Sequence, residues 1–170
     1  MLGLYPGSAI TDKTPELIEA CKVSLLDRGF GQKSGANGSG WGKANKVNLW
    51  ARAKDGNRAY SMLRELINKN IAPNLWDFHP PYQMDGNCGY TSGVCEMLCY
   101  SSDDIIELLP ALPEEWKNGS VKGLCARGGY SLDFTWENGE IKSLSVYSSC
   151  GKKMARIKTG DEIKTVKTVG

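Results

Sequence analysis

The side chains best suited to chemistry lie together near the middle of the chain, in the stretch NLWDFHPPYQMDGNCGYTSG at residues 74–93. It contains the only histidine of the sequence, His79, and six residues further on the carboxylate of Asp85 in an Asp-Gly-Asn turn signal. An imidazole can donate or accept a hydrogen bond near neutral pH. A carboxylate that a turn aims into a cavity can act as a base. Aromatic rings that suit the apolar face of a pyranose surround both groups, namely Trp76, Phe78 and Tyr82.

An ordinary structural explanation stays open for each of these residues. A lone histidine beside prolines is most often structural or solvent-facing, and an aspartate before a glycine commonly hydrogen-bonds its own backbone. The aromatic rings could simply belong to a core. Their density within one loop that glycine and proline stiffen nevertheless favours a site, since loops on a rigid helical scaffold often carry function.

A second candidate is Trp41, which lies in the glycine-rich stretch GFGQKSGANGSGWGK at residues 29–43. Six glycines between residues 29 and 42 predict a loop. An indole in such a loop either tucks against the body of the protein as part of a lid or forms a wall of a ligand cleft.

The elements that must position these loops begin with a helix at residues 14–29. Thr14 suits the N-cap, Pro15 suits the first helical position, and Gly29 suits the C-terminal end. The four-residue spacing of apolar residues predicts a buried stripe made of Leu17, Cys21 and Leu25.

Helical patterns continue to about residue 107. Residues 43–71 predict two antiparallel helices, with a break at the Asp-Gly-Asn of residues 55–57. The apolar positions expected to be buried on them are Val47, Leu49, Trp50, Ala59, Met62, Leu63, Leu66 and Ile67. The stretch at residues 74–93 is expected to be a loop, and a helical pattern resumes in TSGVCEMLCYSSDDIIELL at residues 91–109.

The hydrophobic period changes near residue 108, where apolar and polar residues begin to alternate. Glu-Asn-Gly-Glu at residues 137–140 predicts a hairpin, because Asn-Gly accepts the positive φ angles of a type I′ turn. Gly151 and residues 159–162 punctuate later strands. We therefore predict an α+β chain with a helical domain at residues 1–107 and an antiparallel β domain at residues 108–170.

Composition excludes several classes of protein. The net charge is only +2 at pH 7, too weakly basic to predict a nucleic-acid partner. No apolar run reaches the roughly 20 residues that a membrane span needs, and the first residues do not resemble a signal peptide. The six cysteines form no Cys-x-x-Cys pair, and the chain has only one histidine, which predicts neither a zinc site nor any other metal. We expect them to be mostly buried and not disulfide-bonded.

Four motifs in order resemble the C-terminal part of glycoside hydrolase family 95, the inverting α-L-fucosidases. They are GLYPGS at 3–8, GWGKANKVNLWARAKDGNRAY at 40–60, NLWDFHPPYQMDGN at 74–87 and LLPALPEEWKNGSVKGLCARGGYSLDFTW at 108–136. The resemblance covers nearly the whole chain. It implies that the helices are the last ones of an (α/α)6 barrel, and that the strands form the small β domain that follows the barrel.

The resemblance also implies roles for four residues. In the family a glutamic acid protonates the leaving oxygen, and asparagine side chains held by an aspartate activate the water. The motif HPPYQMDGN matches the segment that supplies this aspartate, so Asp85 takes that role, and His79 matches a residue that contacts the fucose. Trp41 and Lys46 fall in a segment that borders the cleft and are expected on the substrate side. No cofactor is implied.

Two kinds of departure from the family pattern are visible. Gly42, Asn45 and Cys88 stand where serine, tryptophan and phenylalanine are common in the family, which bears on linkage and aglycone preference more than on the sugar. The glutamic acid, the activating asparagines and an Arg-His pair belong upstream of this chain in the family. We expect the chain alone to be inactive, with two partners: the N-terminal part of the same polypeptide and a fucosylated oligosaccharide.

Other functions remain open at this stage. The chain could be a carbohydrate-binding or structural remnant without turnover, or belong to a different (α/α)6 hydrolase of the glucoamylase kind, against which the HPPYQMDGN loop argues. The sequence leaves open fucoside or galactoside preference, and also whether the protein is cytoplasmic or secreted, since a targeting region would lie upstream.

Overall fold

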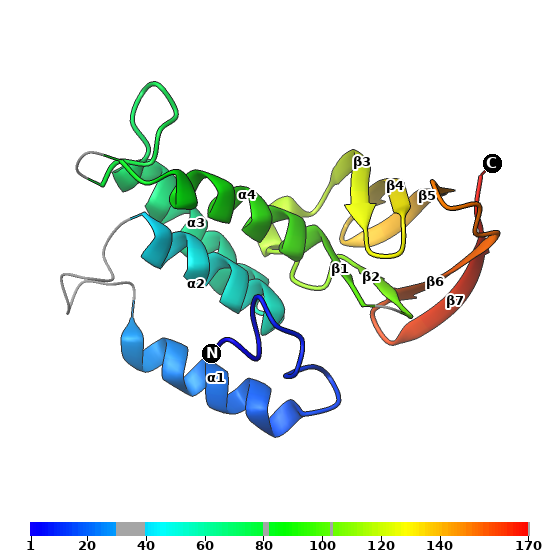
Figure 1. The fold of residues 1–170 in the computed structure, drawn as a ribbon, viewed down its shortest axis with the longest axis horizontal. Coiled ribbons are helices and arrows are strands. Elements are labelled where there is room, and N and C mark those ends of the chain that lie inside the picture. The colour runs from blue at the N-terminus through cyan, green and yellow to red at the C-terminus, as the bar shows by residue number, and fades with distance from the viewer. Residues whose placement is uncertain (30–39, 80–81, 103, 170) are drawn as a thin grey trace.

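The computed structural model describes residues 1–29, 40–79, 82–102 and 104–169, and it has helices at one end and strands at the other (Figure 1). The helices are α1 (Pro15–Arg28), α2 (Trp41–Arg52), α3 (Gly56–Asn70) and α4 (Met84–Leu98), with a 3-10 turn at Glu114–Trp116. The strands are β1 (Cys99–Ser101), β2 (Ile106–Leu108), β3 (Gly119–Ala126), β4 (Tyr130–Glu137), β5 (Glu140–Ser148), β6 (Met154–Thr159) and β7 (Glu162–Lys167). Helices followed by strands confirm the predicted α+β class.

Helix α1 begins at the predicted proline, with Thr14 as the N-cap residue. The predicted stripe is wrong in one member: Leu17 is 43% exposed, and Ile18 is buried with Cys21 and Leu25 in its place. Both Leu17 and Ile18 lie on the same helical face as Cys21, because residues three and four positions apart are neighbours on a helix. The packing of α1 buries Ile18 and leaves Leu17 at the edge. The helix ends before Gly29, whose φ of 56° suits glycine.

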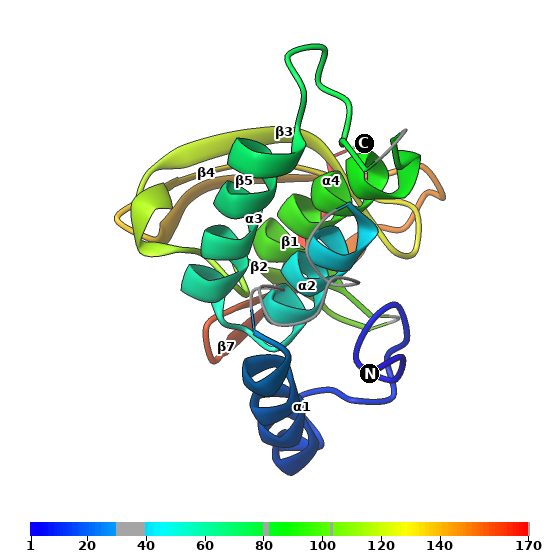
Figure 2. The ribbon, with the colours of Figure 1, turned by 90° about the vertical axis from the view of Figure 1, so that its left-hand side faces the viewer.

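Helices α2 and α3 form the predicted helical hairpin, and Figure 2 shows them beside α4. The break falls at residues 53–55, slightly earlier than predicted. Asp55 ends it as the N-cap of α3, since its Oδ1 accepts a hydrogen bond from the Arg58 backbone N–H at 3.0 Å. The predicted apolar positions are buried except Ile67, which is 46% exposed.

Helix α4 packs closely against α2 through two buried glycines, Gly89 and Gly93. A Cβ atom at Gly89 would lie 2.8 Å from the Cβ of Ala44, and one at Gly93 would lie 2.5 Å from Cγ1 of Val47. No side chain fits there, so the glycines let the two helix backbones approach.

A buried polar side chain completes the contact between α2 and α4. Asn48 is fully buried, and its Nδ2 donates to the carbonyl oxygens of Ala44 and Gly89 at 2.9 and 2.8 Å. Its Oδ1 accepts from the Ser92 hydroxyl at 3.0 Å. Because every polar atom of the Asn48 side chain is paired, burying it costs little and fixes the register of the helices.

The strands begin earlier than predicted. Residues 99–108, expected to continue a helix, contain β1 and β2, which pair antiparallel. Helix α4 ends at Leu98, and Cys99 is extended with φ of −153°. The side chains of β2 are buried along the strand, which favours a strand over an amphipathic helix.

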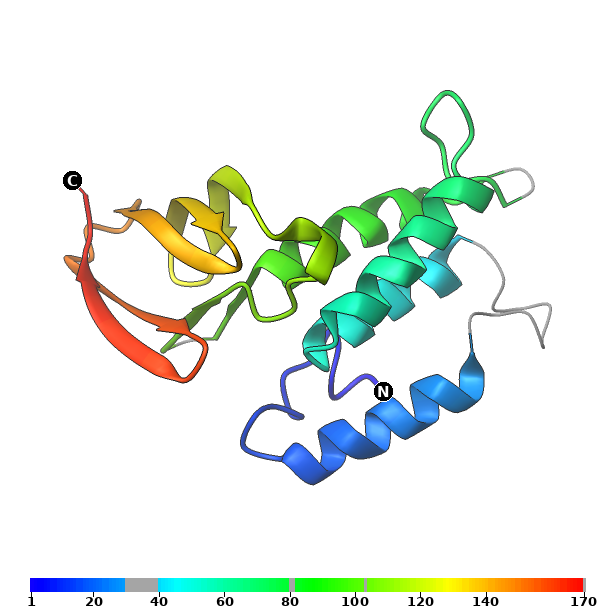
Figure 3. The same ribbon diagram turned by 180° about the vertical axis from the view of Figure 1, so that it is seen from behind.

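The strands form two sheets, with orders β1-β2-β6-β7 and β3-β4-β5, that face each other across a shared apolar core (Figure 3). The β2–β6 pairing is parallel, so the unit is mixed and not wholly antiparallel as predicted. The hairpin at residues 137–140 is confirmed, with φ of 51° at Asn138 and 79° at Gly139. Strands β6 and β7 meet at residues 159–162, also as predicted.

An ion-pair network joins the helices to the strands. Asp12 Oδ2 lies 2.6 Å from Lys54 Nζ and 2.8 Å from Lys158 Nζ. Glu107 Oε1, on β2, lies 2.8 Å and 3.2 Å from the same two ammonium groups. Burial acts against the charged form of Lys158, but the hydrogen bonds and charges of Asp12 and Glu107 outweigh it and raise its pKa.

The expectation that the cysteines are mostly buried is wrong. Cys21 and Cys99 are buried, whereas the other four are exposed, namely Cys88, Cys95, Cys125 and Cys150. All six are free thiols. The pattern fails because Cys95 lies on the outer face of α4, and because Cys125 and Cys150 lie outside the core between the sheets. Among the described residues, no helix is long and apolar enough to cross a membrane.

Candidate active site

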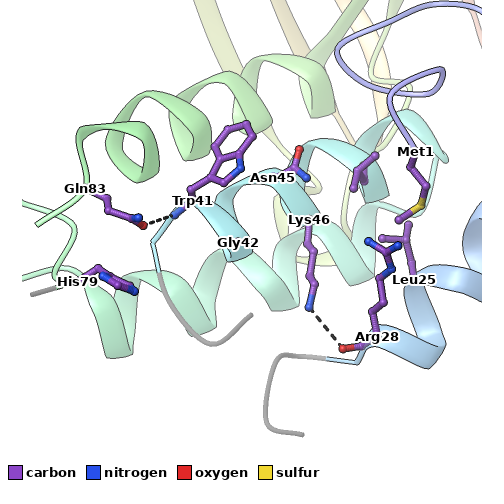
Figure 4. Close-up of a pocket in the computed structure, with 10 residues that line it drawn as sticks. Met1, Leu25, Arg28, Trp41, Gly42, Asn45, Lys46, His79 and Gln83 are labelled. Carbon is purple, nitrogen blue, oxygen red and sulfur yellow. Dashed lines mark hydrogen bonds between the residues drawn. The ribbon is translucent and has the colours of Figure 1, made fainter. Parts of the chain in front are cut away.

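A pocket of about 210 Å³ lies between the C-terminal end of α1, the outer face of α2 and the segment that precedes α4. Three of the four predicted site residues line it together: Trp41, Lys46 and His79 (Figure 4). The remaining lining residues are Met1, Leu25, Arg28, Gly42, Asn45, Leu49 and Gln83.

Trp41 is the first residue of α2 and not a loop residue as expected. Its backbone N–H donates to Gln83 Oε1 at 3.0 Å, which satisfies one free donor at the start of the helix. The ring packs over α4, where a Cβ at Gly89 would lie 3.6 Å from Cζ3. The indole is still 45% exposed, so its free surface is available to a ligand in the pocket.

Lys46 connects the pocket to the end of α1. Its Nζ donates to the carbonyl oxygens of Gly29 at 2.7 Å and Arg28 at 3.5 Å, where a cation complements the negative end of the helix dipole. Burial, and then the charges of Arg28 and Lys43, lower the pKa of its ammonium group. A lysine has three N–H donors, so one remains for a hydroxyl group beyond the two carbonyls.

His79 is exposed and lies in the segment between α3 and α4. Residues 71–79 extend beyond the helix ends, at the opposite side of the molecule from the sheets (Figure 1). Asn87 on α4 braces this segment on both sides: its Oδ1 accepts from the Asp77 N–H at 2.9 Å, and its Nδ2 donates to the Leu75 carbonyl at 2.7 Å. Sequence reasoning gave Asn87 no role beyond its place in the motif.

Asp85 lies apart from the other three predicted residues. It does not line the pocket, and it occupies the first turn of α4 and not a tight turn of its own. Its side chain is exposed to solvent, near the positive end of the helix dipole, which favours a carboxylate. The Asp-Gly-Asn sequence was misleading because Gly86 lies within α4, where the Asp77 carboxyl group fills the space of a side chain.

Sequence reasoning also missed Asp77. Its side chain is 0% exposed, and neither carboxyl oxygen has a hydrogen-bond partner among the described residues. Burial raises its pKa, and the charges of His79 and Lys43 only partly oppose that rise. An aspartate between Trp76 and Phe78 gives no periodic signal, so nothing in the sequence marked it as buried.

The groups that line the pocket suit hydrogen bonding to a polyhydroxylated ring. Amide and cationic groups supply hydrogen bonds from several sides, and the indole supplies an apolar face, as in sugar sites. No carboxylate is among the described residues that line it. Across the described chain, no group of three or more His, Cys, Asp or Glu side chains could hold a metal ion.

Two family models match the chain. The glycosyl hydrolase family 95 catalytic domain matches residues 1–98, and the glycoside hydrolase family 95 C-terminal domain matches residues 100–169. The chain therefore belongs to glycoside hydrolase family 95, in agreement with the resemblance seen in its motifs.

Curated relatives carry the names of fucosidases. The chain is 35% identical over 161 residues to alpha-L-fucosidase 2 of Arabidopsis thaliana, covering 87% of this chain and 18% of the relative. It is 32% identical over 160 residues to the probable alpha-fucosidase A of Aspergillus oryzae, with 81% and 22% covered. The counterpart from Aspergillus niger is 31% identical over 178 residues, with 93% and 22% covered. The chain thus spans about a fifth of the length of these relatives.

Proposed function

We propose that this chain is the C-terminal part of a glycoside hydrolase that removes terminal α-L-fucose, α-1,2-linked, from oligosaccharides with inversion. Membership of family 95 supports the class of reaction. The observation that carries the sugar site is the pocket itself, which brings Trp41, Lys46 and His79 together from two segments far apart in the sequence. In this proposal the indole covers one face of the sugar, and the imidazole and ammonium groups bond its hydroxyls.

Asp85 is proposed as the carboxylate that polarises the asparagine side chains that activate the water. An amide is a poor base unless a carboxylate faces it, and inversion needs a gap of roughly 6.5–9.5 Å between acid and base to hold the water. The position of Asp85 outside the pocket is compatible with this role, because its exposed carboxylate can face groups of another segment. Those groups, and the glutamic acid that protonates the leaving oxygen, are proposed to lie upstream.

The N-terminal part of the same polypeptide is proposed as the partner of the helical end. Apolar side chains are exposed there on neighbouring segments, which is typical of a surface that another segment covers. They are Leu75, Trp76, Phe78, Tyr82 and Met84. We propose that the helices within residues 1–107 complete an (α/α)6 barrel with that part. Residues 108–170 then form most of the β domain, whose first sheet also includes β1 and β2.

A second candidate function is carbohydrate binding without turnover. The absence of a carboxylate from the described pocket lining favours it, because binding needs only the hydroxyl-bonding groups. An assay of hydrolysis distinguishes the two functions, because only the hydrolase releases fucose.

The experiment compares the 170-residue chain with the product of the complete reading frame that encodes it, using an α-1,2-fucosylated oligosaccharide. We expect fucose release from the complete product and none from the chain alone, since each missing acid or base group contributes roughly 10² to 10⁴ in rate. Fucose release by neither, together with retained sugar binding, would favour the binding function instead.

A further inference from the structure

The Asp77 carboxyl group lies at the junction of the segments that carry the proposed site residues. It is fully buried, and both of its oxygens are unpartnered among the described residues. A Cβ atom at Gly40 would lie 3.2 Å from Oδ2, and one at Gly86 would overlap with the same oxygen. The carboxyl group therefore fills a niche between the start of α2 and the first turn of α4, which only glycines leave open.

Each contact of this niche adjoins a residue of the proposed site. Gly40 directly precedes Trp41, and Gly86 directly follows Asp85. Asp77 itself stands two residues before His79. Its backbone adds to the junction, because its carbonyl oxygen accepts from the N–H of Gln83, a pocket residue, at 3.1 Å.

No positively charged side chain forms an ion pair with this carboxyl group among the described residues. The charges that act on it are those of His79 on its own segment and Lys43 on α2. On α4, Asp85 is the residue next to Gly86 in the sequence. The Lys43 ammonium group is already engaged on α3, with Asn70 Oδ1 at 2.8 Å and Glu65 Oε1 at 3.3 Å. Burying an unpaired carboxyl group costs stability, and natural proteins keep such costly features mainly at functional sites.

We propose that Asp77 is a positioning residue of the sugar site, whose buried carboxyl group sets, through its own ionisation, the relative placement of Trp41, His79 and Asp85. Sugar binding at this site rests on the function proposed above. The coupling of the three residues to Asp77 is independent of that function. A negative charge in this niche attracts positive charge on His79 and Lys43, and the carboxyl group that carries it lies against Gly40 and Gly86. Gain or loss of the Asp77 proton therefore moves the three segments together.

The test is a pH titration of the 170-residue chain followed by NMR. The signals are the Trp41 indole N–H, the His79 ring C–H and the Asp85 side-chain carboxyl carbon. His79 is assigned without ambiguity as the only histidine. We expect all three signals to share one titration step, with a midpoint above about 4, the ordinary value for aspartate.

Two variants decide the origin of the shared step. Asp77→Asn keeps the shape of the side chain and removes its ionisation, so the shared step is lost. Asp161→Asn makes the same chemical change at an exposed turn between β6 and β7, so the step is kept. Absence of a shared step from the wild-type chain, or its persistence in Asp77→Asn, overturns the proposal. Neither result depends on hydrolysis, so failure of the proposed fucosidase function would appear separately in the assay of fucose release.

Discussion

The close contact between α2 and α4 makes a prediction that can be worked out in numbers. Gly93 faces Val47 across it, and a Cβ atom at position 93 would lie 2.5 Å from Val47 Cγ1. The perturbation is Gly93→Ala, alone and together with Val47→Ala. The contact matters for the site because it sets the separation of the two helices whose first turns carry Trp41 and Asp85.

The expected changes in the free energy of unfolding follow from the volume of the side-chain atoms that each variant adds or removes. Overpacking by the new methyl group costs about 1–3 kcal/mol, and the better helix propensity of alanine offsets about 1 kcal/mol of that cost, so Gly93→Ala lowers the free energy of unfolding by about 1 kcal/mol. Val47→Ala removes two buried carbons and leaves a cavity, a loss of about 2.5 kcal/mol. In the double variant the new methyl group at position 93 occupies the vacated space, and the total loss is about 1.5 kcal/mol instead of the additive sum of about 3.5 kcal/mol.

The assay is equilibrium denaturation in urea, followed by tryptophan fluorescence, on the wild type, both single variants and the double variant. The discriminating quantity is the coupling free energy of about 2 kcal/mol between the two positions. If the losses add within about 0.5 kcal/mol, the methyl group does not meet Val47, and the described packing of α4 on α2 is refuted.

Three further predictions concern charge and thiol chemistry. Lys158→Met lowers the free energy of unfolding at pH 7, measured by denaturation, by about 2 kcal/mol. Burial acts to raise the pKa of Asp12, but its pairing with Lys158 and Lys54 outweighs burial and holds that pKa below its ordinary value. The loss of stability therefore disappears as the pH falls below the lowered pKa of Asp12. Asp77→Asn raises the unfolding midpoint at pH 7 and leaves it unchanged at pH 3, since burial raises the pKa of that group and stability is lost as it ionises. A thiol reagent labels Cys88, Cys125 and Cys150 of the native chain rapidly, and Cys95 more slowly, because burial raises the pKa of that thiol. It labels Cys21 and Cys99 only after unfolding, in line with burial that raises the pKa of Cys99 to about 12.

Features that local chemistry decides could be predicted from the sequence. The proline at the start of α1 and the Asn138–Gly139 turn need only their own φ angles, so both appear where they were predicted. The amphipathic face of α3 was equally predictable, except for Ile67 at its edge.

Features that depend on distant neighbours could not be predicted in this way. Gly86 was interpreted as a turn residue, yet it is glycine because Asp77 fills the space of its side chain. Strand β2 forms within residues predicted to be helical because it pairs with β6 about 50 residues later, which no local pattern contains. The pocket residues Trp41, Lys46 and His79 were identified through family motifs, and their grouping follows from how α2 packs against α1 and the segment before α4.

The most direct test of the proposed site is the effect of Asp85→Asn on hydrolysis by the complete reading-frame product, with Asp161→Asn as the matched control. We predict that the wild type and the control release β-L-fucose from an α-1,2-fucosylated oligosaccharide. We also predict that Asp85→Asn lowers the unfolding midpoint only slightly, because it removes one carboxylate from the first turn of α4, and that it loses about 10² or more in kcat. Turnover by Asp85→Asn within a few-fold of the wild type would contradict the role of Asp85, and with it the proposed site.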